Sequence, residues 1–320
     1  MLKELLMLPI RNLFSVIPAM IVIGLAAGYF FDTSALKILI LPVNFLMIYP
    51  SMIGFRLTEL AHLSGKRILL TSVIINFLLL PAAAYLLGSV LLEKSPGIFA
   101  GLAIASLLPT SNMTVNYTAF SKGNVIAAVR LTVLSLVAGS LLAPWYLYLM
   151  VGKYVPVDIW VTFKTIATIV FFPLVFGVIS FHYLMKRYTV EEFSAGIKPL
   201  LTGLSMWGVV FMIFISVSMK SKEIFHSRTI FFIALFAQFL FYGLNYALAI
   251  LGSKVSRLNR ADSFALLYST VLRNLGISLG IATVAFGSQA ALMVSLALLV
   301  QPLLAVWFTR LSCQDRFFRD

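Results

Sequence analysis

The sequence predicts an all-α, polytopic membrane protein with ten transmembrane helices, built as two inverted repeats of five helices. The first observation is composition: 61% of the residues are apolar, 11% are charged, and the mean hydropathy is +1.02. Soluble domains average roughly 45–50% apolar and about 25% charged residues. The second is a series of ten apolar stretches, and the third is a faint internal repeat. Residues 1–320 therefore read as one integral membrane domain, with repeat 1 at about 13–150 and repeat 2 at about 159–311.

The ten apolar stretches are each long enough to cross a hydrocarbon layer, which takes about 20 residues of helix. They are residues 13–31, 36–55, 68–92, 97–120, 125–150, 159–184, 199–219, 229–251, 263–286 and 290–311. The segments on the side of the N-terminus hold fifteen Lys and Arg residues, and the opposite segments hold six. This bias predicts a multi-pass protein of the cell membrane with both termini in the cytoplasm. The basic residues form no run, so we expect no nucleic-acid partner.

The fourth stretch is interrupted by polar residues at 107–116. Pro109 is followed by Thr110, Ser111 and Asn112, and then by Thr114 and Asn116. Lipid cannot satisfy these groups, and a broken helix at this depth is tolerated only inside protein or beside a water-filled cavity. Secondary transporters hold their substrates at such breaks. The sequence therefore predicts a break here, with these side chains as candidate binding groups.

A second interruption lies at residues 270–276, in the ninth stretch. Asn76 precedes Asn112 by 36 residues, and Gln238 precedes Asn274 by the same 36 residues. Five spans followed by five spans face opposite ways, so this spacing indicates an inverted repeat with breaks in matching positions. We expect spans 1, 2, 6 and 7 to form a panel, and spans 3–5 and 8–10 a core. The alternative is that Asn and Gly at the breaks serve only tight helix packing.

Two arginines fall inside the predicted spans, whereas every Asp and Glu falls in a loop or at a helix end. Arg273 lies about ten residues from the nearer end of its span, too deep to reach water easily. It is expected to bind an anion, or else to tie together backbone carbonyl groups. Arg130 lies close to the cytoplasmic end of its span, where it either snorkels or lines the site. The candidate substrate-binding residues are Arg273, Asn274, Thr110, Ser111, Asn112, Thr114, Asn76 and Arg130.

Several short motifs resemble a known superfamily, the one that joins the bile-acid/sodium symporters to the arsenite-efflux permeases. Pro109 followed by residues 122–125 (Lys-Gly-Asn-Val) resembles the fourth-to-fifth span signature of the symporters, and residues 273–276 (Arg-Asn-Leu-Gly) resemble their ninth-span crossover. Residues 46–50 and 285–287 are more similar to the arsenite permeases. The resemblance covers about residues 40–310. It implies ten helices in a panel and a core, with two discontinuous helices crossing.

The resemblance also implies a sodium-ligand set, which this chain alters. The candidate ion-binding residues by position are Thr114, Thr132, Ser269 and Asn76. Ser269 and Arg273 stand where the symporters have a glutamate and a glutamine. An arginine there should repel Na⁺. The arsenite permeases place a cysteine directly after the fourth-span proline and a glutamate in the ninth span, where this chain has Thr110 and Gly276.

The function that the sequence favours is secondary transport of a small organic anion or oxyanion by alternating access, with sodium coupling opposed by Arg273. The alternatives are a sodium-coupled organic anion symporter, an arsenite permease and a membrane receptor that transports nothing. A membrane enzyme would need a nucleophile with a base, or a metal cluster, at depth. The three histidines and one cysteine have no spacing suited to a metal. We expect no metal and no cofactor, and the sequence predicts no oligomeric state.

Overall fold

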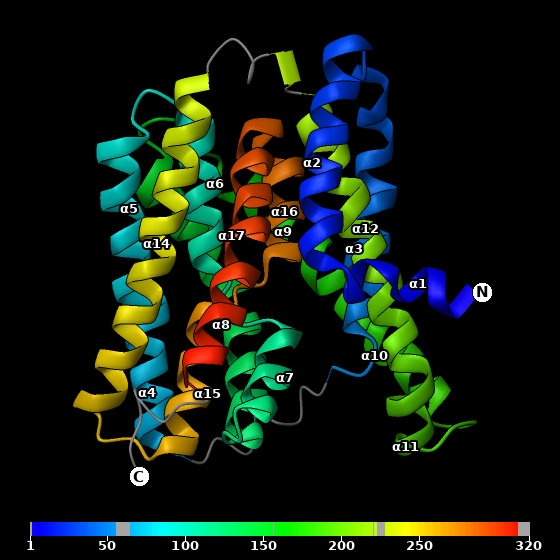
Figure 1. The fold of residues 1–320 in the computed structure, drawn as a ribbon, viewed down its shortest axis with the longest axis vertical. Helices are drawn as coiled ribbons and strands as arrows, with labels where there is room; N and C mark the ends of the chain where they lie inside the picture. Colours follow the sequence, from blue (N-terminus) through cyan, green and yellow to red (C-terminus); the bar gives the residue numbers. More distant parts are fainter. Residues whose placement is uncertain (1, 56–64, 156, 220, 223–227, 313–320) are drawn as a thin grey trace.

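The computed structural model describes residues 2–55, 65–155, 157–219, 221–222 and 228–312. Every regular element in these ranges is a helix, with some turns in 3-10 or π geometry (Figure 1). The elements are α1 (Leu2–Arg11), α2 (Leu13–Phe30), η1 (Ser34–Leu39), α3 (Ile40–Met52), α4 (Lys66–Ile74), η3 (Ile75–Leu79), α5 (Leu80–Leu91), α6 (Pro96–Leu107), α7 (Asn112–Phe120), α8 (Val125–Val151), α9 (Ile159–Ile166), η4 (Ala167–Phe171), α10 (Phe172–Leu184), α11 (Val190–Glu192), η5 (Phe193–Ile197), α12 (Lys198–Ser218), α14 (Arg228–Val255), α15 (Arg260–Val271), α16 (Leu275–Ile281), η6 (Ala282–Phe286) and α17 (Ser288–Ser312).

Eight described helical stretches are long and apolar enough to cross a membrane. They correspond to the second, third and fifth to tenth predicted spans. The first predicted span is α2, which joins α1 at a sharp bend, and the pair counts as a ninth only if taken together. The fourth is divided between the short helices α6 and α7. The count of ten and the inverted repeat therefore stay predictions, whereas the all-helical membrane architecture is confirmed.

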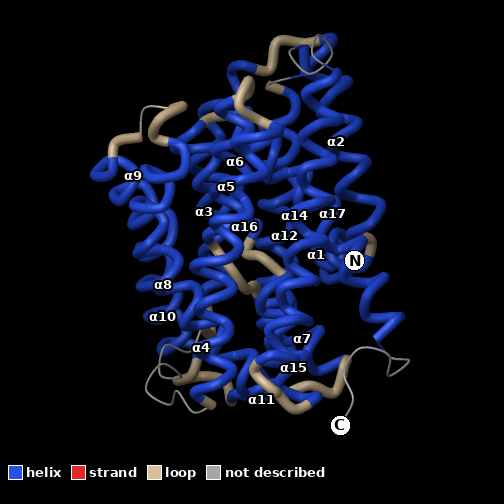
Figure 2. Tube along the Cα trace, turned by 90° about the vertical axis from the view of Figure 1, so that its left-hand side faces the viewer, coloured by secondary structure: helices blue, strands red, loops and turns tan. Residues whose placement is uncertain are grey.

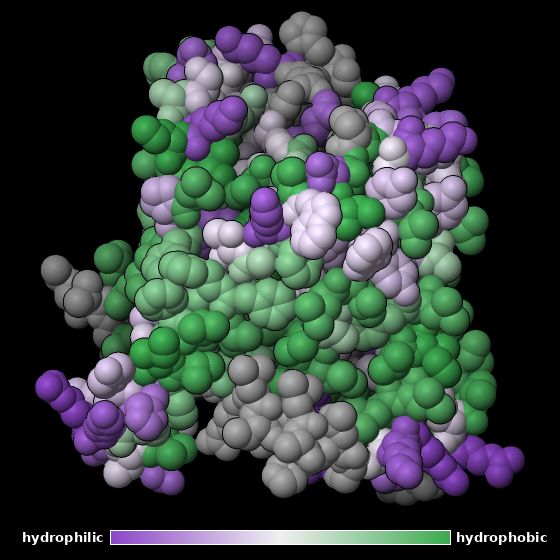
Figure 3. All heavy atoms as spheres, turned by 180° about the vertical axis from the view of Figure 1, so that it is seen from behind, coloured by the Kyte–Doolittle hydropathy of each residue, from purple (hydrophilic) through white to green (hydrophobic). Residues whose placement is uncertain are grey.

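The outer surface is apolar across its middle. Seen from behind, a broad hydrophobic band separates hydrophilic residues at the two ends of the molecule (Figure 3). Large apolar side chains such as Phe30, Val90, Leu149 and Trp160 are more exposed than buried. This exposure is what a hydrocarbon environment requires, because lipid and not water is the solvent there.

The helices form two groups that can be followed in Figure 1. One group holds α2, α3, α10 and α12, in which α12 packs along both α2 and α3. The other holds α4 to α8 and α14 to α17, with α6 packed between α5, α8 and α17. The groups meet mainly where α16 and α17 contact α3, α12 and α2. Both helix breaks belong to the second group and lie in the middle of the molecule (Figure 2).

A polar clip joins the start of α8, which follows α7, to the start of α15, which ends at the second break. Asn124 caps α8 by accepting from the N–H of Ala127 (3.0 Å), and Asn259 caps α15 by accepting from the N–H of Asp262 (2.8 Å). The Asp262 carboxylate accepts from the side-chain amides of Asn124 (2.8 Å) and Asn259 (3.2 Å). The backbone N–H of Asn124 also donates to the carbonyl of Ala261 (2.9 Å). One carboxylate therefore holds the start of α8 against the start of α15, the helix that ends at the second break.

Replacing Asp262 with alanine should lower the free energy of unfolding by about 1–2 kcal/mol, because two amide donors lose a charged acceptor. Thermal unfolding of the detergent-purified protein measures this loss. The matched control is Glu93→Ala, which removes an exposed loop carboxylate and should leave the melting temperature unchanged. Equal melting temperatures for the two variants would show that the clip does not stabilise the fold.

Candidate functional site

The first break separates α6 from α7 at residues 108–111. Pro109 has no N–H to continue the α6 ladder. Thr110 has a φ of +66°, a left-handed conformation that β-branched residues rarely adopt and that is typical of functional sites. The backbone N–H of Ser111 donates to Oγ1 of Thr114 (3.1 Å), which fixes the entry into α7. The predicted interruption is therefore present, over fewer residues than the polar run.

The second break separates α15 from α16 at residues 272–274. Asn274 caps α16, since its Oδ1 accepts from the N–H of Ile277 (3.3 Å). Its own backbone N–H donates to the carbonyl of Leu108 in the first break (2.9 Å). Oγ1 of Thr114 donates to the carbonyl of Tyr268 on α15 (3.3 Å). The two breaks are thus joined directly to each other by backbone and side-chain hydrogen bonds.

Gln301 on α17 holds the second break in place. Its Oε1 accepts from the backbone N–H of Arg273 (2.8 Å), and its Nε2 donates to the carbonyl of Arg273 (3.4 Å). The hydroxyl of Tyr242 on α14 also donates to Oε1 (2.8 Å). The sequence analysis does not single out this amide, which lies beside Pro302 in an apolar stretch. Its role in binding a break was missed, although an amide in an apolar span was a visible signal.

The guanidinium of Arg273 is buried and has no acid partner among the described residues. The side chain is 1% exposed. Its Nη1 donates to Oδ1 of Asn76 (3.2 Å), its Cζ lies 5.8 Å from the ring centre of Phe241, and its Nε and Nη2 have no hydrogen-bond partner. It is turned neither toward lipid nor against a carboxylate. A positive charge therefore remains uncompensated at the crossing of the breaks.

Asn76 lies in the π-helical turn η3 and belongs to the same polar cluster. Its Nδ2 donates to Oγ of Ser72 (3.1 Å) and to Oγ1 of Thr270 (3.5 Å), while its Oδ1 accepts from Arg273. The oxygen that a sodium ion would need at this position is therefore occupied by a guanidinium N–H. π-Helical turns of this kind are frequent at functional sites.

The hydroxyls of the other candidate ion ligands bond to nearby backbone carbonyl groups. Oγ of Ser269 donates to the carbonyl of Leu266 (2.9 Å), and Oγ1 of Thr132 donates to the carbonyl of Ala128 (2.8 Å). Thr114 donates to Tyr268 across the crossing, as given above. The hydroxyl hydrogens of these residues are therefore used in bonds to backbone carbonyl groups, and only the lone pairs of the oxygens remain for an ion.

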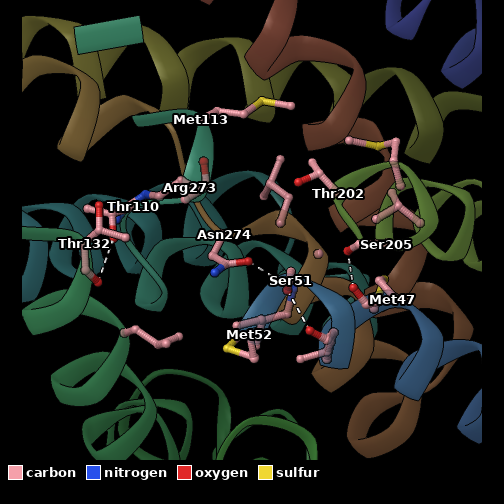
Figure 4. Close-up of a pocket in the computed structure, with 18 of the residues that line it drawn as sticks. Met47, Ser51, Met52, Thr110, Met113, Thr132, Thr202, Ser205, Arg273 and Asn274 are labelled. Atoms are coloured by element: carbon pink, nitrogen blue, oxygen red, sulfur yellow. Dashed lines mark hydrogen bonds between the residues drawn. The ribbon is translucent and has the colours of Figure 1, made fainter. Parts of the chain in front are cut away.

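A cavity of about 140 Å³ lies between the breaks and the other helix group, bordered by α3 and α12. Figure 4 shows Arg273, Thr110 and Thr132 on one side of it and Met47, Thr202 and Ser205 on the other. Its polar border consists of Thr110, Ser111, Thr132, Arg273 and Asn274 from the breaks and α8, and of Ser51, Thr202, Ser205 and Gln301 from α3, α12 and α17. The described border contains one cation and no carboxylate.

The structure therefore brings together some of the sequence-predicted residues and not others. Asn76, Thr114, Ser269 and Arg130 do not border the cavity. Arg130 is half-buried on α8. Asn112 begins α7, but its side chain lies outside the described part of the structure. The sequence analysis missed the residues of α3 and α12 that border the cavity. An apolar helix face has the same sequence pattern whether it faces a cavity or lipid.

Comparisons with known proteins identify a family and a relative of this chain. A model of the Sodium Bile acid symporter family matches residues 38–227, which is more than half of the chain. The "Uncharacterized protein YbaS" of Bacillus subtilis (strain 168) is 26% identical over 237 residues, covering 72% of this chain and 73% of that protein. The matched family region runs from η1 past α12 and includes the first break and both helices that face it.

Proposed function

Because the chain belongs to the sodium bile acid symporter family, a family of membrane transporters, we propose that it moves a small organic monoanion across the cell membrane by alternating access. The observation that carries this proposal is the uncompensated Arg273 at a cavity where two helix breaks cross. Each conformational state would open this cavity to one side of the membrane. The protein would bind and release its solute unchanged, so the proposal is transport and not enzymatic catalysis.

The proposal includes the full architecture that the sequence favours. In it, α2 is the first span and the pair of α6 and α7 is the fourth, which gives ten spans in two inverted repeats with both termini in the cytoplasm. The helix group of α2, α3, α10 and α12 is the panel, and the group that contains the breaks is the core. The hydrogen bond between Asn274 and Leu108 supports a core that moves as one unit.

The size of the cavity limits the solute. A volume of about 140 Å³ resembles the roughly 150 Å³ apolar cavity that holds one benzene molecule. This volume favours a solute smaller than a steroid. The border also holds Met47, Met52, Met113 and Met206, whose flexible thioethers adapt to an irregular apolar body. The solute class is thus a small monocarboxylate with a short branched or cyclic apolar part.

The charge of Arg273 opposes sodium coupling. Two unit charges about 4–6 Å apart interact by roughly 3–4 kcal/mol at an effective dielectric constant of about 20. This energy attracts a carboxylate and repels Na⁺ by the same amount. Asn76 supports this assignment, because its carbonyl oxygen already accepts from the guanidinium. The proposed transporter therefore runs without a sodium ion.

A thermal-shift experiment on the detergent-purified full chain tests the proposal. The probes are 3-methyl-2-oxobutanoate, taurocholate and arsenite, each added in sodium chloride and in choline chloride. We expect the small monocarboxylate to raise the melting temperature equally in both salts, and the other two to have no effect. A shift that requires Na⁺, or that only taurocholate or arsenite produces, would contradict the proposal. Uptake of the labelled monocarboxylate by proteoliposomes separates a transporter from a receptor.

The variant Gly276→Leu tests whether the solute binds in this cavity. A Cβ at Gly276 would meet only Asn274 Oδ1 and Val209 Cγ2, both at 3.9 Å, so the first added carbon fits without strain. The rest of the leucine side chain would fill part of the cavity. The variant should keep the melting temperature of the empty protein and bind 3-methyl-2-oxobutanoate at least about tenfold more weakly. Unchanged binding would place the solute elsewhere.

A further inference from the structure

The buried charge of Arg273 is fixed to the same part of the protein that forms the breaks. Gln301 binds both the N–H and the carbonyl of this residue, and Asn76 binds its Nη1. These contacts come from α17 and η3, which belong to the helix group that contains the breaks. The guanidinium therefore cannot stay behind when that group moves against α3 and α12. Any reorientation of the site across the membrane carries this charge with it.

The empty and the loaded site consequently differ in net charge. With two guanidinium nitrogens unpartnered and no carboxylate on the described cavity border, the empty site carries one positive charge. A bound monoanion cancels this charge. A neutral site crosses a low-dielectric barrier more easily than a charged one, because desolvation of an unpaired charge is costly. The loaded site should therefore reorient faster than the empty site.

We propose, on the basis of the function proposed above, that the protein is an electrogenic monoanion carrier that exchanges anions rapidly and exports them when the membrane is negative inside. After release outside, the positive empty site is drawn inward by the potential, which completes an export cycle. After release inside, the same potential holds the empty site back, which slows an uptake cycle. Arg273 thus takes the place of a coupling ion, and the membrane potential sets the direction of net transport.

The expected size of the effect follows from the charge that moves. One elementary charge that crosses the full field gains about 2.3 kcal/mol per 100 mV, which corresponds to roughly a 50-fold change in an equilibrium constant. Net export of a monoanion should therefore respond to a 100 mV inside-negative potential by up to about 50-fold. Exchange of anion for anion moves only the neutral, loaded site, so its rate should depend little on the membrane potential.

The experiment uses the full chain in vesicles of phosphatidylethanolamine and phosphatidylglycerol loaded with ¹⁴C-labelled 3-methyl-2-oxobutanoate. Potassium gradients with valinomycin set the potential. At zero potential, unlabelled 3-methyl-2-oxobutanoate outside should accelerate efflux of label at least about tenfold. Without external anion, an inside-negative potential should accelerate efflux and an inside-positive potential should slow it. An efflux rate that depends on neither the external anion nor the potential would overturn the proposal.

Variants of Arg273 provide a second test of the proposal. Arg273→Lys keeps the charge and should keep acceleration by external anion. Arg273→Gln makes the empty site neutral. At saturating anion, the remaining efflux of label should therefore no longer be accelerated by external anion. Acceleration that persists in this variant would contradict the role of this charge. The two proposals fail differently: binding with potential-independent flux removes only the exchange mechanism, whereas absence of binding and of flux in the unmodified protein removes both.

Discussion

Replacing Arg273 with methionine is expected to weaken binding of a small monoanion by about 100-fold. A unit charge about 6 Å from the bound carboxylate contributes roughly 2.8 kcal/mol at an effective dielectric constant of about 20, and each 1.4 kcal/mol is a factor of ten in affinity. The guanidinium is 1% exposed, so solvent screens this interaction less than at a surface. Thermal shift titration with 3-methyl-2-oxobutanoate measures the loss.

The same substitution should not lower the melting temperature of the empty protein, which separates a binding role from a structural one. Methionine leaves Oδ1 of Asn76 without a donor, but it also removes a buried charge that has no acid partner. Replacing buried charge by apolar volume is often neutral or stabilising. If Arg273→Met unfolds more readily and binds normally, the arginine ties the breaks together and does not attract the anion.

Arg130→Met is the matched control, because Arg130 is the other arginine of the predicted spans. It is half-buried on α8 and does not border the cavity. Its replacement should leave the affinity for the anion within about twofold of the unmodified protein, which is below 0.5 kcal/mol. A loss as large as that of Arg273→Met would show that the positive charge of the spans acts collectively and not at one site.

The two breaks could be predicted from the sequence because each violates a local rule. A proline with hydroxyl and amide side chains cannot continue through lipid, and Arg273 beside Asn274 and Gly276 cannot either. The break positions found at residues 108–111 and 272–274 fall inside the predicted segments. Local chemistry was therefore sufficient to locate both breaks.

The partners of the breaks could not be predicted in the same way. Gln301 lies 28 residues after Arg273 in the chain and reaches it only through the packing of α17. Ser51 and Ser205 border the cavity from two different apolar helices, and nothing in the local sequence separates them from serines that border no cavity. Ser51 even donates to the carbonyl of Ile48 on its own helix (2.7 Å). The helix α1 was also missed, because a ten-residue amphipathic segment is too short to register as a span. Tertiary packing decides each of these positions.

Replacing Gly139 with alanine is expected to destabilise the first break directly. An added Cβ at this position of α8 would lie 2.7 Å from the carbonyl oxygen of Leu107, the last residue of α6. That atom is backbone and cannot rotate away, so α6 or α8 must shift. Overpacking of this kind typically costs about 1–3 kcal/mol. The melting temperature in detergent should fall, and anion affinity should fall with it because Thr110 and Ser111 move with the break.

Gly243→Ala is the control that isolates this clash. Gly243 lies inside α14, where an added Cβ would meet nothing within 4 Å. Both substitutions make the same chemical change in a long apolar helix and gain the same helix propensity, about 1 kcal/mol for glycine to alanine. The difference in melting temperature between the two variants therefore measures contact with the break alone. Equal melting temperatures would mean that α8 does not support the backbone of Leu107, and that the break is held from the side of Asn274 and Gln301 instead.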